Sequence, residues 1–166
     1  MVPDRATRPT RREQPPSRSV CRPMPISFQD ILGALEFVSM GGAPGEHEAI
    51  LCRQTGKIYW RSEFSDLDEL NDELPDHIDD DEKYVAIPDK RVLGLGKPLA
   101  LAFARELLPD DFDEVRSIFS KKGAYQKFRT LLARRHAVDR WHDFESEATE
   151  RALRDWCKLN SIAVAD

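Results

Sequence analysis

The chain has 166 residues, with 30 acidic residues against 25 Lys and Arg and a formal net charge of −5. This length indicates one domain, or one domain with a tail, and the acidity argues against generic binding of the whole molecule to nucleic acid or acidic membranes. No run approaches the ~18 consecutive apolar residues of a membrane helix, and the N-terminus lacks the apolar segment of a secretory signal. The three distant cysteines, Cys21, Cys52 and Cys157, are typical of a reducing compartment. We therefore expect a cytosolic protein without membrane association.

Residues 1–25 are predicted to form a disordered tail. They hold six Arg, two acids and six Pro, and have almost nothing apolar to offset the entropy of ordering. Subtracting their +4 from −5 leaves −9 on residues 26–166, the predicted single domain. The tail is interpreted either as an Arg-rich arm for phosphate or acidic lipid, or as a solvated extension with the true start at Met24. The solvated extension is the preferred interpretation.

The domain is predicted to begin with a helix and a β-hairpin. Ser27 suits an N-cap, and the apolar residues after it recur at helical spacing until a pair of glycines ends the pattern. Strand-like runs at 48–53 and 57–61 flank a short turn in which Gly56 can adopt a positive φ. We expect these runs to pair with each other.

A third strand is predicted at residues 83–87. Between the hairpin and this strand, residues 63–82 carry eleven acids and no Lys or Arg. The leucines of this segment are spaced by three and four, which predicts a short, frayed amphipathic helix broken at Pro75.

The C-terminal half is predicted to be helical. Its apolar stripes cover four segments: 95–107, 111–119, 124–132 and 139–156. Pro109 and Gly123 separate them. Residues 162–164 either add a short strand or fray. The predicted fold class is α+β, with an N-terminal helix and a small antiparallel sheet (hairpin plus one strand) packed with a C-terminal group of about four helices.

The sequence contains no pattern that specifies a chemistry. The four His form no pair at metal-ligand spacing, no Gly-x-Ser-x-Gly elbow is present, and residues 94–97 lack the full spacing of a P-loop. Cys52 and Cys157 are interpreted as small buried residues. The carboxylates of 76–82 suit a hard cation but lack the glycine and spacing of an EF-hand, which favours a solvated acidic loop. We expect no metal, no cofactor and no enzymatic activity.

The strongest charge feature is the segment 121–140, with seven Lys and Arg and one acid. One interpretation is a surface for nucleic acid or an acidic partner. The preferred one is compensation of the acidic segment and of helix C-termini inside the fold. If a binding surface exists, its exposed members are predicted to be Tyr125, Lys127, Arg129, Arg134 and Arg135. Phe128 and Trp141 are expected in the core.

Several motifs occur in a characteristic order. Residues 122–132 contain a Gly-Ala-aromatic-x-x-Phe-basic block, followed by Trp-x-x-Phe at 141–144 and Ala-Leu-x-x-Trp at 152–156. Together with the turn at 54–57 and the segment 84–88, this order resembles the bacterial uncharacterised protein family 0158 over about residues 45–163. The tail lies outside that pattern, and His142 stands where the family more often has an aromatic residue. The resemblance implies a bacterial cytosolic protein and no particular activity.

Three functions are predicted, in order of preference. The first is a non-enzymatic interaction or regulatory module that binds a charged protein partner, because segregated charge favours steered binding. The second is a nucleic-acid-binding protein that uses the helices of 121–140. The third is a metal-dependent hydrolase that uses the carboxylates of 76–82. No oligomeric state is predicted.

Overall fold

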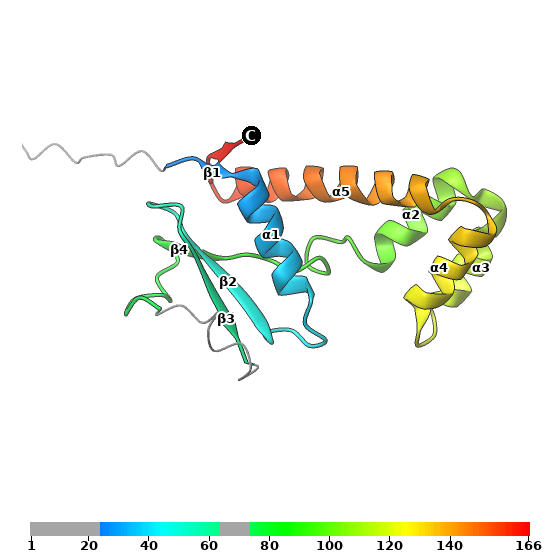
Figure 1. Ribbon diagram of the computed structural model, residues 1–166, viewed down its shortest axis with the longest axis horizontal. Coiled ribbons are helices and arrows are strands. Elements are labelled where there is room, and N and C mark those ends of the chain that lie inside the picture. Colours follow the sequence, from blue (N-terminus) through cyan, green and yellow to red (C-terminus); the bar gives the residue numbers. More distant parts are fainter. Residues whose placement is uncertain (1–23, 64–73) are drawn as a thin grey trace, which may run out of the picture.

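The N-terminal half of the molecule is a small sheet with one helix across it. The computed structural model describes residues 24–63 and 74–166. Strands β2 (His47–Cys52), β3 (Ile58–Ser62) and β4 (Tyr84–Ala86) form an antiparallel sheet in the order β3-β2-β4, and helix α1 (Phe28–Ser39) packs on its central strand (Figure 1). The alternation of β2 buries Ala49 and Leu51 on one face, and α1 buries Ile31 and Leu35.

The predicted helix, hairpin and third strand are confirmed. Gly56 has a φ of +74°, the left-handed conformation that the hairpin turn requires. A Cβ on this residue would lie 3.0 Å from the side chain of Ile26, so the position is also sterically tight. Ser27 is the N-cap residue of α1, but its side chain makes no capping hydrogen bond. It belongs instead to β1 (Ile26–Ser27), which pairs in parallel with β5 (Val164–Ala165).

Two predicted segments lie wholly or partly outside the described residues. These are the tail, up to residue 23, and residues 64–73 of the predicted acidic helix. The described remainder of that helix, 74–82, forms turns. Asp80 organises them, since one carboxylate oxygen accepts the Glu82 N–H at 3.0 Å and the other lies 3.4 Å from the Lys83 ammonium. Short acidic side chains compete with the backbone for its donors, which favours turns over helix.

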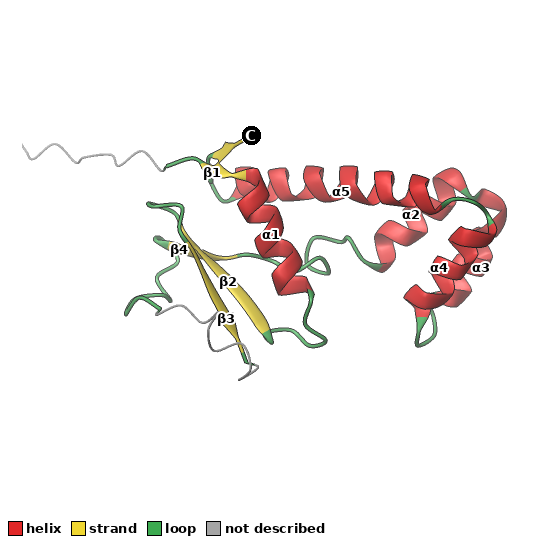
Figure 2. Ribbon diagram, viewed as in Figure 1, coloured by secondary structure: helices red, strands yellow, loops and turns green. Residues whose placement is uncertain are grey.

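The C-terminal half consists of helices, as predicted. They are α2 (Lys97–Leu107), the 3-10 turn η2 (Pro109–Asp111), α3 (Phe112–Ile118), α4 (Ala124–Arg134) and α5 (Val138–Leu159) (Figure 2). Gly123 precedes α4 with a φ of +72°, which explains why the helical pattern breaks there. The C-terminal run, for which a strand or a frayed end was predicted, forms β5. Within the described residues, no helix is long and apolar enough to cross a membrane.

An aromatic cluster holds the helices together. Phe103 of α2 is fully buried and meets three rings edge-on, those of Phe128, Trp141 and Phe144, with centroids 5.3–6.5 Å away. Such edge-to-face pairs add to the free energy of burying their apolar area. Phe128 and Trp141 are 1% and 8% exposed, which confirms their prediction as core residues.

Several contacts join the two halves. The Ile26 N–H donates to the Ala163 carbonyl at 2.9 Å, and the Lys90 N–H donates to the Ser39 hydroxyl at 3.0 Å. The guanidinium of Arg154 lies 4.4 Å from the centre of the Phe28 ring. The buried apolar residues of both halves also form one continuous core. Helix α5 thus runs along the helical half and reaches the N-terminal half at its C-terminal end (Figure 1).

Candidate functional site

The candidate site is a groove between α4 and α5 with a volume of about 370 Å³. Each helix lines it with four residues spaced i, i+3, i+4 and i+7, which places them on one helical face. Those of α4 are Tyr125, Phe128, Arg129 and Leu132, and those of α5 are Val138, Trp141, His142 and Glu145. Six of the eight are apolar, aromatic or imidazole side chains, so the groove suits an apolar ligand surface.

Apolar side chains are exposed at the rim of this groove. Tyr125 is 53% exposed and Val138 is 37% exposed, while Phe128 and Leu132 are buried beneath them. The Tyr125 ring packs edge-on against Phe119 with centroids 5.3 Å apart, which fixes its position. Burial and the charge of Glu145 raise the pKa of Tyr125. Its hydroxyl, protonated at neutral pH like that of any tyrosine, can donate a hydrogen bond.

Arg129 supplies the positive charge of the groove. It is exposed, and among the described residues no carboxylate forms an ion pair with it. Lys127 is also exposed and likewise lacks an ion pair with any residue the structure describes. It lies two positions away, however, and is therefore rotated by about 200° to the opposite side of α4. Of these two predicted binding residues, Arg129 lines the groove and Lys127 does not.

Arg134 and Arg135 are engaged inside the fold. One nitrogen of the Arg134 guanidinium donates to both carboxylate oxygens of Glu114, at 2.9 and 3.0 Å. Arg135 donates to Asp111 at 2.6 Å, and Asp111 is buried, with 5% of the residue exposed. The hydrogen bond and the charge of Asp111 raise the pKa of Arg135. These two cations therefore connect α4 to η2 and α3, and they compensate acids outside the segment 63–82.

Besides the buried Phe128, Leu132 and Trp141, three groove residues are absent from the predicted set, namely Val138, His142 and Glu145. Their signal is present in the sequence, because together with Trp141 they continue an i, i+3, i+4, i+7 pattern at the start of α5. From the sequence alone, this pattern indicates a helix face that packs in the core. Only the position of α4 in the structure shows that the same face lines a groove. His142 is also the residue that stands where the resembled family more often has an aromatic, and in the structure it lines the candidate site.

The acidic side chains of residues 76–82 are not arranged around a common point where a cation could bind. Across the described residues, no group of three or more His, Cys, Asp or Glu side chains is arranged to hold a metal ion. Asp80 uses its carboxylate to organise the local turns, as described above. We therefore build no site on this segment.

The two described cysteines are buried thiols whose pKa values are shifted in opposite directions. Burial alone would raise the pKa of Cys52, but hydrogen bonds from the Thr55 side chain and from the backbone of Thr55 and Gln54 outweigh it, so the pKa is lowered. Burial raises the pKa of Cys157. The thiolate is the reactive form of cysteine, so the two thiols should differ in the pH at which they become reactive.

We expect Cys52 to be alkylated by iodoacetamide at lower pH than Cys157. In a Cys21→Ser variant, the pH–rate profile of each site can be followed by peptide mass spectrometry. The Cys52 profile should reach its plateau at the lower pH. The opposite order would contradict the assigned hydrogen bonds, and a Thr55→Val variant should move the Cys52 profile toward higher pH without moving that of Cys157.

No protein-family model, curated protein or solved structure matches the chain. The resemblance to family 0158 therefore stays a prediction from its motifs. The candidate site is supported only by the positions of its residues in the structure.

Proposed function

We propose that the protein is a cytosolic, non-enzymatic binding module, which holds an acidic amphipathic helix of a protein partner in the α4–α5 groove. One observation carries the proposal: Arg129 has no ion-pair partner among the described residues, and it lines the same groove as the exposed Tyr125 and Val138. The free thiols of Cys52 and Cys157 agree with a reducing compartment.

The shape of the groove favours a helical ligand. Two helices that each contribute i, i+3, i+4 and i+7 residues leave an elongated apolar trough between them, and amphipathic helices bind such troughs through the same spacing. Tyr and Arg are enriched among residues that dominate binding energy. Tyr125 and Arg129 lie one helical turn apart on the same bank, so one apolar side chain and one carboxylate of a ligand helix can reach them together.

The charge distribution favours a short acidic segment over a polyanion. The net charge of −5 opposes the approach of a long phosphate backbone. Arg134 and Arg135 are held by Glu114 and Asp111, which removes two cations that a nucleic acid would need. A helix with a few carboxylates needs one well-placed cation, and Arg129 provides it.

A matched pair of variants tests the proposal. The probe is a fluorescein-labelled helical peptide of about 14 residues with Leu at i, i+3, i+4 and i+7 and Glu at exposed positions. Arg129→Glu and Lys127→Glu make the same charge change on the same helix, but only the first changes the groove. In fluorescence anisotropy, we expect Arg129→Glu to weaken binding at least about tenfold, or ~1.4 kcal/mol. Lys127→Glu should change the Kd less than about threefold, which is ~0.6 kcal/mol.

Two results would contradict the proposal. No measurable binding of the peptide would remove it, provided that circular dichroism shows the peptide to be helical. Equal weakening by both variants would show that general charge, and not the groove, attracts the probe. If a single-stranded RNA then bound with an affinity that falls steeply with salt, the nucleic-acid alternative would be favoured instead.

A further inference from the structure

The α4–α5 groove does not end at Tyr125. A second cavity of about 340 Å³ adjoins it and shares Tyr125 and Glu145 as lining residues. A third cavity of about 260 Å³, between α1 and α5, shares Lys90 and Glu145 with the second. Glu145 lines all three. The three cavities therefore lie in a row beside α5 between Val138 and Glu150, about 18 Å at 1.5 Å per residue, and are treated together as one groove.

A glycine at the start of α2 leaves room for the Tyr125 side chain. Gly96 is the N-cap residue of α2, and a Cβ on it would lie 3.2 Å from the Tyr125 hydroxyl. Tyr125 of α4 can therefore lie close to the loop that precedes α2, where Lys90 and Leu95 also line the groove. This contact places Tyr125 between the α4–α5 cavity and the second cavity, both of which it lines.

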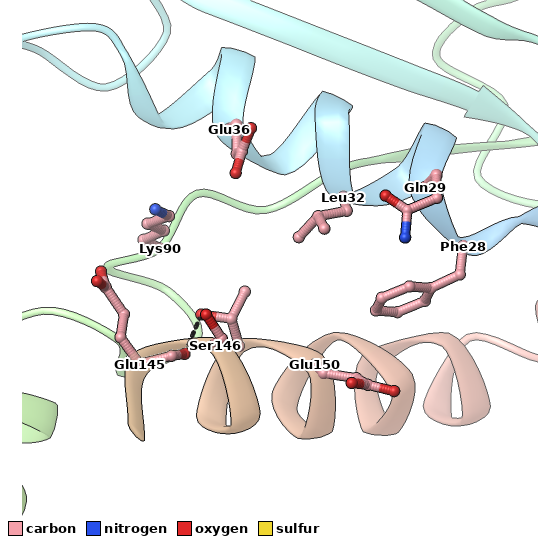
Figure 3. A pocket seen from close by; sticks show the side chains of 9 residues that line it. Phe28, Gln29, Leu32, Glu36, Lys90, Glu145, Ser146 and Glu150 are labelled. Atoms are coloured by element: carbon pink, nitrogen blue, oxygen red, sulfur yellow. Dashed lines mark hydrogen bonds between the residues drawn. The ribbon is translucent and has the colours of Figure 1, made fainter. Parts of the chain in front are cut away.

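The two ends of the groove carry opposite charge. The α4 end holds Arg129. At the α1 end, Glu36 and Glu150 line the cavity with one cation, Lys90, while Glu145 lines all three cavities and belongs to neither end alone. Lys90 projects between the helices, with Glu36 of α1 on one side and Glu145 of α5 on the other (Figure 3).

These acids are partly compensated. Glu150 is paired with Arg154 at 2.9 Å. Among the described residues, Glu36 has no ion pair. The Glu36 carboxylate is therefore the group of the α1 end that a cationic side chain of a ligand can meet.

The α1 end also has an apolar floor. Phe28 and Leu32 of α1 point from one bank toward α5 (Figure 3). Phe28 is buried, and the guanidinium of Arg154 covers its ring at 4.4 Å. An apolar side chain with a terminal cation, such as Lys or Arg, suits a surface with an apolar floor and acidic rim.

We propose that the partner segment is a helix whose two ends carry opposite charges. Acidic residues lie at the end that meets Arg129, and basic residues lie at the end that meets Glu36. The proposal rests on the function proposed above and extends it from one cavity to the whole groove. A helix of about 12 residues spans the 18 Å, and opposite charges at its ends fix its direction, because the reversed orientation would place like charges together.

Three peptides with the same Leu stripe and about 14 residues test this proposal. The first carries Glu throughout, the second Glu in one half and Lys in the other, and the third Lys throughout. Fluorescence anisotropy should give the second peptide at least about tenfold higher affinity than the first, and the third the weakest binding. Glu36→Lys should remove the advantage of the second peptide and leave the affinity for the first unchanged or higher.

Asp30→Lys is the matched control, because Asp30 lies on α1 outside the groove, beside Trp60. It makes the same charge change and should leave the affinity order unchanged. Arg129→Glu should weaken both Glu-containing peptides.

The extension and the underlying function can fail separately. If the first and second peptides bind equally, or if Glu36→Lys acts no differently from Asp30→Lys, the proposal of a helix with oppositely charged ends is overturned. The proposed α4–α5 binding site then still stands. If neither Glu-containing peptide binds, or if the Lys-only peptide binds best, both proposals are overturned. Thermal unfolding of each variant confirms that the compared proteins are folded.

Discussion

Replacing Phe103 by alanine is expected to lower the free energy of unfolding by about 3–5 kcal/mol. Phe103 is fully buried, and three aromatic rings from α4 and α5 pack edge-on against it. Its truncation would remove the apolar contacts of the ring and leave a cavity that rigid aromatic neighbours cannot fill. Since a domain of this kind has a total stability of ~5–15 kcal/mol, the variant should be only marginally stable.

Urea unfolding followed by circular dichroism measures this effect. Tyr125→Ala is the matched control, because it also deletes an aromatic ring, but one that is 53% exposed. We expect it to cost about 1 kcal/mol or less. A Phe103→Ala effect as small as that of the control would contradict the central place of Phe103 in the core.

Replacing Leu35 by alanine is expected to destabilise both halves of the protein together, by about 2–5 kcal/mol. Leu35 is fully buried in α1, within a core that continues into the helical half. The β1–β5 pairing and the Lys90–Ser39 hydrogen bond also link the halves. If these contacts make one cooperative unit, loss of packing in the N-terminal half lowers the unfolding midpoint of α5 as well.

A Trp60→Phe background makes this measurable, because the remaining tryptophans, Trp141 and Trp156, both lie in α5. The Leu35→Ala transition seen by their fluorescence should coincide with the transition seen by circular dichroism. Leu159→Ala, at an 86% exposed position of α5, should change the stability by less than about 0.5 kcal/mol. An unchanged fluorescence transition would show that residues 26–166 unfold as two units.

The order and type of most elements could be predicted because their causes are local. Apolar residues at helical spacing indicate α1, α2, α4 and α5 wherever a chain buries one face. Gly56 and Gly123 were expected to end elements, and both have the positive φ that other residues avoid. The parallel pair β1–β5 could not be predicted, because each strand has two residues and its partner lies at the other end of the domain.

The candidate site, like the fold, was predictable where its causes are local in the sequence and not where they depend on tertiary contacts. The sequence alone identified the basic segment 121–140 and placed Tyr125 and Arg129 on its surface, since charge and periodicity are properties of neighbouring residues. It could not separate Arg129 from Arg134, because both are arginines of one helix. That difference arises from tertiary packing, which brings Glu114 of α3 against Arg134 and leaves Arg129 beside α5. The groove likewise exists only where α4, α5 and the loop before α2 meet, so its residues acquire a common role from the fold.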